Sequence, residues 1–414
     1  MNLLEQPRAR KALFALLYFS EGAPIGFVWW ALPTMLREEG VSIERITSLT
    51  SLLTLVWAFK FLWAPVVDVL RGPRWSLRAW IVASQVAMAA TLLPLLWVDK
   101  ARSFELLTVL LVLHAFAAAT QDVSIDALAI RSTGPAERGS LNGWMQAGML
   151  LGRSAFGGGA LYARHHFGDG AVIVLLVAVL CTTLASTLLF RDTSSLSTAS
   201  VGLAQHLRDF RTHLRAALGR KSVWFGLAFA VTGAVAFEAV GAVAGPILVD
   251  RGHGDAVGWF FMVPVAACML GGALVGGYVS DRLGRRRTVV LSSLWVAASV
   301  LLLAAVDGPL AIGSESALLG GLALVYFGSG LLTASSYALF MDLTDPALGS
   351  TQFSAFMGAT NLCESWTIRT TGMLVAARGY PTAFAIMAIV SLFTLPLLVG
   401  MRARNGGPAT RDAM

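Results

Sequence analysis

Charge and cysteine are both scarce in this 414-residue chain. Only 13% of its residues are charged, whereas a soluble protein of this length carries about 25%. Its three cysteines, Cys181, Cys268 and Cys363, lie in apolar stretches and form neither a disulfide framework nor a metal-ligand spacing. The sequence also lacks a P-loop and a catalytic triad. It therefore gives no support to an enzyme, a nucleotide-driven machine or a metalloprotein, and we expect neither a cofactor nor a metal.

Apolar sequence is what the chain has in abundance. Hydrophobic residues make up 56% of it, and runs of about 20 apolar residues recur along its length, which is typical of a helical protein that crosses a membrane many times. The first run follows basic residues, as in a signal peptide. It is long, contains Glu21 and shows no cleavage site, so we expect a retained helix. Twelve spans are predicted, at residues 12–36, 45–68, 77–98, 104–131, 139–163, 170–190, 222–250, 255–282, 287–306, 314–342, 350–378 and 381–401.

The distribution of Lys and Arg among the predicted loops provides a test of the twelve-span count. The net charge is +7, and of the 31 Lys and Arg residues 21 fall in the termini and in the loops expected on one side. Seven fall in the opposite loops and three within spans. Since positively charged loops stay in the cytoplasm, this bias predicts that both chain ends are cytoplasmic. The positive charge belongs to these loops and does not indicate nucleic-acid binding.

The first half of the chain and the second half share a repeated sequence pattern. Pro33 precedes Asp68 by 35 residues, and Pro246 precedes Asp281 by the same distance. The sequences around the two prolines, ALPTMLREEG and AGPILVDRGHG, are also similar. This pattern predicts an all-α membrane protein with two pseudo-symmetric six-helix halves.

A polar stretch separates the halves, which we place at residues 1–190 and 222–414. Residues 191–221 carry leucines and arginines at helical spacing. This spacing is typical of an amphipathic helix on the inner leaflet, and a solvated linker helix is the alternative.

The stretch GGYVSDRLGRRR at 276–287 ends one predicted span and begins the next. It fits the pattern G-x-x-x-D-R-x-G-R-R, with the fixed positions at Gly277, Asp281, Arg282, Gly284, Arg285 and Arg286. We expect the first glycine to let a neighbouring helix approach, the aspartate to pair with a basic group or a helix N-terminus, and the arginines to hold the loop in the cytoplasm.

This pattern resembles the loop between the second and third helices of each half in the major facilitator superfamily of transporters. The resemblance implies two lobes that rock about a central site, with the first, fourth, seventh and tenth helices lining the cavity. It also implies a cytoplasmic gate at this loop and at its first-half counterpart, where the candidate residues are Lys60, Asp68 and Arg71. Arg131, at the end of the fourth span, is a further gate candidate.

Ionisable side chains within spans cost about 2.5–3.5 kcal/mol each to insert, so each needs a reason. Arg153, Glu238 and Glu364 fall near the middle of the fifth, seventh and eleventh spans. Their common depth predicts a substrate or proton site, and a buried Arg–carboxylate pair that fixes helix packing is the alternative. Arg369 and Glu21 are further candidates for substrate binding.

The fourth span carries TQDVSIDALAIR at 120–131. Asp122 and Asp126 share a helix face, and His114 lies in the same broad arc. These three side chains predict a proton relay, and Glu238 is a further candidate for proton coupling. The alternative is that Asp126 pairs with Arg131 or Lys60 as part of the inner gate.

The first span carries SEGAPIGFVWW at 20–30, whose glycines and proline are expected to bend or break the helix near Glu21. Interrupted helices often mark binding sites in transporters. Trp29 and Trp30 either stack on an aromatic substrate or belong to the outer interfacial aromatic belt. Two neutral residues at similar depth complete the candidate substrate site: Tyr337 and Asn361.

Three further segments narrow the resemblance: KFLWAPVVDVLRG at 60–72, TQDVSIDALAIRSTGPAERG at 120–139 and TQFSAFMGATN at 351–361. They resemble the AmpG-type branch of the superfamily, which includes muropeptide permeases, acetyl-CoA transporters and inner-membrane siderophore permeases of the pyochelin and rhizobactin type. In length and span number the chain is most similar to the siderophore permeases.

The resemblance implies a monomeric, proton-coupled importer of a ferric siderophore in the bacterial inner membrane. A muropeptide or another anionic metabolite is the alternative cargo. A transporter-like sensor that binds a ligand and signals is the alternative of another class.

Overall fold

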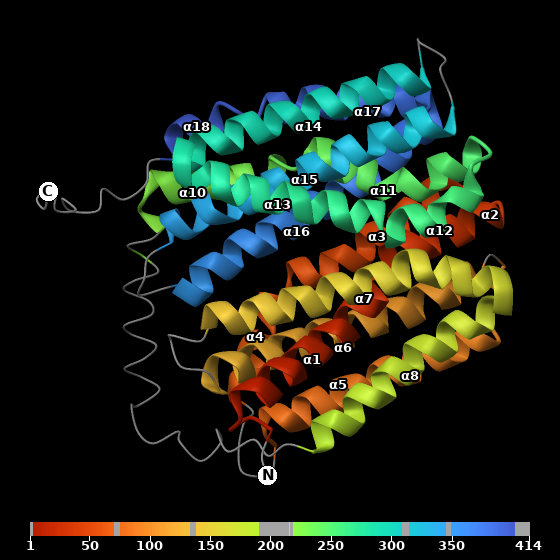
Figure 1. Cartoon of the computed structure of the whole chain (residues 1–414), viewed down its shortest axis with the longest axis vertical. Helices are drawn as coiled ribbons and strands as arrows, with labels where there is room; N and C mark the ends of the chain where they lie inside the picture. The colour runs from red at the N-terminus through yellow and green to blue at the C-terminus, as the bar shows by residue number, and fades with distance from the viewer. Residues whose placement is uncertain are drawn as a thin grey trace, which may run out of the picture.

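The computed structural model describes residues 3–69, 75–100, 102–132, 138–189, 215, 218–308, 314–344 and 349–401. Every regular element within these residues is a helix. Figure 1 shows the helices from the first half of the chain (red to yellow) gathered below those from the second half (green to blue). The amphipathic helix predicted at 191–221 lies almost entirely outside the described residues.

The N-terminal group of helices begins with a stretch that is nearly unbroken to Glu38. Its elements are α1 (Pro7–Gly26), the π-helical turn η1 (Phe27–Ala31), α2 (Leu32–Glu38), α3 (Ile43–Ala58), η2 (Lys60–Leu62), α4 (Ala64–Val69), α5 (Leu77–Leu92), η3 (Leu93–Leu96), α6 (Phe104–Ser132), α7 (Arg138–Phe167) and α8 (Asp169–Leu188).

The C-terminal group begins with a span that is interrupted at Gly233 and Ala234, shortly before Glu238. Its elements are α10 (Lys221–Thr232), α11 (Val235–Asp250), α12 (Gly254–Met262), α13 (Pro264–Leu283), α14 (Arg285–Asp307), α15 (Glu315–Leu343), α16 (Gly349–Arg378), α17 (Tyr380–Leu392) and α18 (Leu397–Gly400).

Twelve membrane spans account for these helices. Within the described ranges, nine helical stretches are long and apolar enough to cross a membrane, and the bent pair Gly254–Met262 and Pro264–Ser280 forms a tenth. The remaining two are α7 and α16, which are long enough at 30 residues each but more polar. They carry Arg153 and Glu364 respectively. The predicted all-helical fold is therefore confirmed, and these two polar spans each carry a residue of the predicted site.

Glycines set the distance between α1 and α7. A Cβ on Gly26 would lie 2.2 Å from the carbonyl oxygen of Arg153, and Gly22 lies equally close to α7. The glycines therefore allow the two backbones to touch, as small residues do between membrane helices. The predicted break near Glu21 is wrong, because α1 continues to Gly26 and loosens only at Phe27–Ala31, where one π-helical turn follows.

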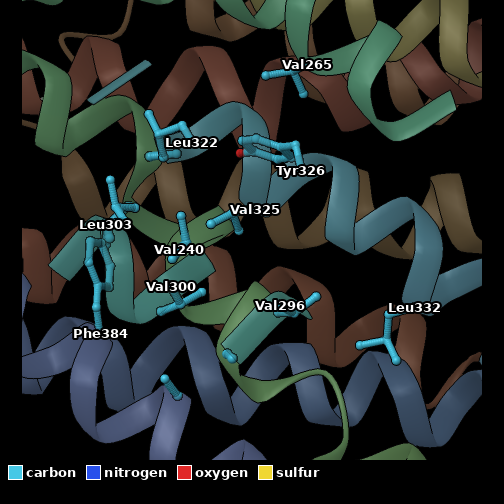
Figure 2. Packing of buried hydrophobic residues seen from close by; sticks show 14 of the residues in the cluster. Val240, Val265, Val296, Val300, Leu303, Leu322, Val325, Tyr326, Leu332 and Phe384 are labelled. Atoms are coloured by element: carbon cyan, nitrogen blue, oxygen red, sulfur yellow. The ribbon is translucent and has the colours of Figure 1, made fainter. Parts of the chain in front are cut away.

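An apolar core holds the C-terminal group together (Figure 2). Leu322, Val325 and Tyr326 of α15 lie in it with Val300 of α14 and Val240 of α11, all essentially inaccessible. In a bilayer, lipid tails are as apolar as these side chains, so close van der Waals packing rather than removal from water stabilises this arrangement. The core fixes α15, whose polar side chains face the cavity described below.

The two groups meet along α3–α16 and α7–α12. A Cβ on Gly158 would lie 2.1 Å from the carbonyl oxygen of Gly258, so α7 and α12 touch backbone to backbone. Ser51 and Ser365 join α3 and α16 through their hydroxyl oxygens, which lie 3.1 Å apart. We call the helix ends near Glu38 and Asp250 the outer ends, and the contacts of α7 with α12 lie toward them.

The motif at 276–287 is only partly as expected. A Cβ added to Gly277 would have no atom within 4 Å, whereas a Cβ on Gly276 would meet α15, 2.8 Å from the carbonyl oxygen of Leu331. The prediction that Gly277 permits close approach is therefore wrong by one residue. Gly284 has φ +87°, which favours glycine, and it separates α13 from α14.

The arginines of the motif bind neighbouring groups. Arg285 donates to the carbonyl oxygen of Ala338 at 2.9 Å and pairs with Asp342 at 3.1 Å, which joins α14 to α15. Arg282 lies over the ring of Tyr278 at 4.4 Å, and Arg286 is exposed. Arg71 and the side chains of Asp68, Arg131 and Asp281 are outside the described part of the structure, so the gate assigned to them stays a prediction.

Candidate functional site

A cavity of about 390 Å³ lies between the two groups of helices. This volume is within the range of small-molecule sites. Six of the eight predicted substrate-binding residues line it: Trp29, Arg153, Glu238, Tyr337, Asn361 and Glu364. They come from η1, α7, α11, α15 and α16, so the folded chain brings together side chains that are up to 335 residues apart.

Glu21 and Arg369 do not line the cavity. Glu21 is buried nearer the inner ends of the helices, and Arg369 is exposed and donates to the hydroxyl of Ser48 at 3.1 Å. The fourth span, α6, contributes no lining residue either. The expected ring of first, fourth, seventh and tenth helices is wrong in this respect, because α3, α7 and α16 supply the walls that were assigned to α6.

Charge in the cavity is unevenly balanced. Arg153 attracts both Glu238 and Glu364, and the two carboxylates repel each other. Glu364 accepts a hydrogen bond from the indole N–H of Trp29 at 2.6 Å, which links the N-terminal and C-terminal groups across the cavity. One cation therefore shares the cavity with two carboxylates that are largely shielded from bulk solvent, where charges interact more strongly than in water.

Four buried polar atoms on residues that line this cavity make no hydrogen bond within the described structure: Trp57 Nε1, Arg153 Nε, Tyr326 Oη and Ser329 Oγ. Tyr326 is 1% exposed and Ser329 0%. Such atoms are rare in folded proteins, because leaving a buried donor without an acceptor costs about 1–3 kcal/mol. We therefore regard this part of the cavity as shaped for a ligand.

Aromatic side chains form much of the remaining wall. Trp29 and Trp57 meet edge to face with ring centroids 5.4 Å apart, and Trp30 is only 7% exposed. The interpretation of Trp29 and Trp30 as an outer aromatic belt is wrong, because both face the cavity. Their position leaves flat apolar surfaces on which a ring of the substrate can stack.

Sequence reasoning missed most of the neutral lining residues. They carry hydroxyl, amide or aromatic groups and lie within apolar spans, where no charge marks them: Thr50, Thr54, Trp57, Gln146, Phe237, Tyr326, Ser329, Thr333 and Thr360. The one signal for them is the spacing of Tyr326, Ser329, Thr333 and Tyr337, which places four polar side chains along one face of α15.

A second group of charges lies within the N-terminal group of helices. We call it the inner cluster: Tyr18, Glu21, Lys60, Asp122 and Asp126. Lys60 forms an ion pair with Asp122, and the Tyr18 hydroxyl donates to Asp126. The Glu21 carboxyl interacts with that of Asp122, and one of its oxygens is buried without a hydrogen bond.

Lys60 therefore pairs with Asp122, one helical turn before Asp126, for which the pairing was proposed. The alternative in which Asp126 pairs with Lys60 is wrong, because the lysine reaches Asp122 and the tyrosine takes Asp126. His114 lies apart from this cluster: its Nδ1 is 3.2 Å from both Thr91 Oγ1 and the carbonyl oxygen of Met88 on α5. No described hydrogen bond joins His114 to the aspartates, so the structure provides no connected relay.

The sequence pattern of the Major Facilitator Superfamily matches residues 14–271 and again 234–413. The chain belongs to this superfamily. It is therefore a multi-pass membrane transporter of the secondary type and not an enzyme. The two overlapping matches agree with the repeat of the two halves, and the fold of paired helical groups around one cavity is that of the superfamily.

Two relatives from bacteria cover nearly the whole chain. A protein named anhydromuropeptide permease from Escherichia coli K12 is 25% identical over 97% of this chain and 81% of its own. A protein named putative transporter AmpG 4 from Rickettsia conorii is 22% identical over 92% of this chain and 94% of its own. They support the AmpG-type branch and its muropeptide permeases, and they give no support to the siderophore permeases.

A solved structure described as a D-xylose-proton symporter superposes with a TM-score of 0.75, covering 94% of this chain and 95% of the other. The two sequences are 12% identical, so the likeness concerns the fold alone.

The outer ends of this superfamily member carry an ion pair between the two groups. Arg37 donates to both carboxylate oxygens of Asp250, at 2.6 and 2.8 Å, and Tyr380 donates to the same carboxylate at 2.7 Å. Arg37 lies four residues after Pro33, and Asp250 lies four residues after the corresponding proline of the second half, Pro246. Equivalent positions of the two repeats thus meet, with opposite charges.

Proposed function

We propose that the protein is a permease that imports an anhydromuropeptide-like fragment of the cell wall across the bacterial inner membrane. The single observation that carries this proposal is the similarity to an anhydromuropeptide permease over 97% of the chain. The site supports it independently, because the cavity combines aromatic surfaces, neutral hydrogen-bonding groups and one arginine.

The cavity chemistry suits a substrate that carries both a sugar and a carboxylate. Sugar rings present apolar faces that pack on aromatic side chains, for which Trp29 and Trp57 are positioned. Sugar hydroxyl and amide groups need donors and acceptors, and Gln146, Asn361 and the α15 hydroxyls supply them. Arg153 is the group that binds a carboxylate with two parallel hydrogen bonds.

We infer a mechanism of alternating access in which the two groups, residues 1–190 and 222–414, rock about the cavity. The cavity is lined from both groups, so a relative rotation changes it. The Arg37–Asp250 pair and the α7–α12 contact join the outer ends, which supports an arrangement closed on that side. The chain ends would face the cytoplasm, since most Lys and Arg residues lie on their side.

The energy source we propose is a proton gradient. Buried carboxylates can bind and release protons, and intramembrane carboxylates often do so in transporters. The candidates are Glu238 in the cavity and Asp122 and Asp126 in the inner cluster. Because one chain contains the whole cavity, a monomer suffices for transport.

Uptake by purified protein in liposomes tests the proposal. With an inward proton gradient, a radiolabelled anhydromuropeptide should accumulate, and collapse of the gradient should stop accumulation. The Arg102→Gln variant is the control, because the Arg102 side chain is 89% exposed and does not line the cavity. Accumulation of a ferric pyochelin-type siderophore in place of the muropeptide would overturn the proposal in favour of the siderophore prediction.

A further inference from the structure

Three of the four unpartnered atoms of the cavity belong to Arg153, Tyr326 and Ser329, which we call the donor wall, and the fourth, Trp57 Nε1, comes from α3. Tyr326 and Ser329 lie one turn apart on α15 and share a face. Arg153 reaches the wall from α7, with its guanidinium carbon 5.5 Å from the ring centre of Trp30. Trp30 packs on Phe261 at 5.3 Å, and Phe261 packs on Tyr326 at 6.0 Å. This chain of rings links the arginine on α7 to the tyrosine on α15, and the arginine also interacts electrostatically with the tyrosine.

All three groups can donate hydrogen bonds. A guanidinium N–H donates only, and a phenol and a serine hydroxyl can each turn a proton toward an acceptor. A cluster of donors with one positive charge fits an anionic oxygen acceptor better than a hydroxyl or an amide. The chemistry of this wall therefore selects a carboxylate group.

The charge balance of the cavity limits how a carboxylate can enter. Arg153 faces Glu238 and Glu364, so the cavity already carries one excess negative charge when both are ionised. A substrate carboxylate would add another, and unpaired charges are costly in a site of low dielectric. Binding together with one proton leaves the total unchanged.

The hydrogen bonds and neighbouring charges of Glu238 and Glu364 indicate which of the two carboxylates accepts the proton. Glu364 accepts from Trp29 Nε1, and a hydrogen bond to a carboxylate favours its ionised form. No described hydrogen bond supports Glu238. The charged and titratable groups around Glu238 are Arg153 on α7, Tyr326 and Tyr337 on α15, and Cys363 and Glu364 on α16. Arg153 is the only cation among them, and the substrate engages it.

We propose that Arg153, Tyr326 and Ser329 form the subsite for a carboxylate of the substrate, and that this carboxylate binds together with one proton, which Glu238 accepts. This inference rests on the proposed function and identifies a carboxylate as the substrate group that Arg153, Tyr326 and Ser329 recognise. It also places the coupling of substrate and proton in one cavity, where the same arginine attracts both carboxylates.

Two probes test the inference by direct binding to the purified protein. One is an anhydromuropeptide with free carboxylates, and the other is the same compound with its carboxylates converted to carboxamides. A hydrogen bond to a charged group contributes enough to change affinity by about 10- to 100-fold, so the wild type should prefer the acid by this factor. Arg153→Gln should bind both probes alike, whereas Arg102→Gln should keep the wild-type preference.

Proton uptake is the second readout. In calorimetry with buffers of different ionisation enthalpy, the wild type should take up about one proton when it binds the acid and none with the carboxamide. Glu238→Gln should bind the acid without proton uptake. Size-exclusion profiles and thermal unfolding show whether each variant is folded, and Arg153→Lys, which keeps the charge but loses the planar fork, should retain part of the preference.

The outcomes separate the two ideas. If the wild type binds neither probe, the proposed function fails and the inference fails with it. If the wild type binds the acid but Arg153→Gln discriminates as well as the wild type, the carboxylate subsite is wrong while the proposed function stands. Proton uptake that persists in Glu238→Gln overturns the role of Glu238.

Discussion

The central cavity and the inner cluster are both built from one cation and several buried carboxylates, yet they differ in origin. The cavity combines Arg153 of the N-terminal group with Glu238 and Glu364 of the C-terminal group. The inner cluster takes Lys60 and its carboxylates from the N-terminal group alone. A rocking motion of one group against the other therefore changes the distances in the cavity and leaves those in the inner cluster intact.

This difference indicates which of the two clusters can respond to substrate binding during transport. In the inner cluster the cation is already in a direct ion pair with Asp122, and Asp126 has a donor in Tyr18. In the cavity the Arg153 Nε has no hydrogen-bond partner among the described residues. The inner cluster keeps one Glu21 oxygen without a hydrogen bond, but its cation is already paired, so it is suited to holding α1, η2 and α6 together. The cavity, whose arginine has an unpartnered N–H, is suited to binding a substrate.

The largest expected effect is loss of stability in Lys60→Gln. Asp122 is 7% exposed and Lys60 28%, so removal of the lysine leaves a largely buried carboxylate without its cation, which costs up to about 3–5 kcal/mol. Thermal unfolding in detergent should show this loss, and the second substitution Asp122→Asn should recover a large part of it. A single variant as stable as the wild type would show that the inner cluster does not hold the helices together.

The next effect concerns transport. Glu238→Gln should lose gradient-driven accumulation of the anhydromuropeptide by at least about tenfold, because substrate entry no longer brings a proton. Exchange of substrate across the membrane without a gradient should continue. Asp126→Asn in the inner cluster is the comparison. If Glu238 is the coupling group, as inferred above, and the other candidate Asp126 is not, this variant should still accumulate substrate. Equal loss in both variants would break the distinction between the two clusters.

Gly26→Ala should shift the cavity and spare the inner cluster. The added Cβ would meet the carbonyl oxygen of Arg153, and overpacking of this kind costs about 1–3 kcal/mol. Binding of the acid probe should weaken together with thermal stability. Gly277→Ala is the matched control, because a Cβ there has no atom within 4 Å, and it should be neutral. An unchanged Gly26→Ala variant would mean that α1 does not set the position of Arg153.

The smallest expected effect belongs to the outer ion pair. Asp250→Asn weakens a partly exposed pair worth about 0.2–1 kcal/mol, so the outer side should open about 1.4- to fivefold more often. The rate at which an impermeant maleimide labels a cysteine placed at Thr50, in a background without the three natural cysteines, measures this opening.

A second ion pair provides the control for this measurement. Arg251 and Asp307 form a similar two-bond pair, but both lie in the C-terminal group. Arg251→Gln should therefore leave the labelling rate as it is. If it accelerates labelling as much as Asp250→Asn, the effect does not come from the contact between the two groups.

Much of the site is visible in the sequence because ionisable side chains stand out in apolar spans. Arg153, Glu238 and Glu364 are candidates because of their depth, and all three line the cavity. Glu21 is a candidate by the same rule and lies elsewhere, since depth along a helix does not tell which neighbour a side chain faces. Tyr326 and Ser329 carry no such signal, because a neutral residue in an apolar span looks like any other packing residue.

The sequence alone determined the number of spans, the side of the membrane expected for each loop, and the repeat that relates Arg37 to Asp250, since these follow from apolar runs, basic loops and spacing along the chain. Only the tertiary structure decided that α6 stays out of the cavity, that Lys60 pairs with Asp122, and that Arg153 shares the cavity with the two glutamates. The reason is physical. Which faces meet depends on how closely two backbones can approach, and glycine contacts such as that of Gly26 with α7 set this distance through three-dimensional packing.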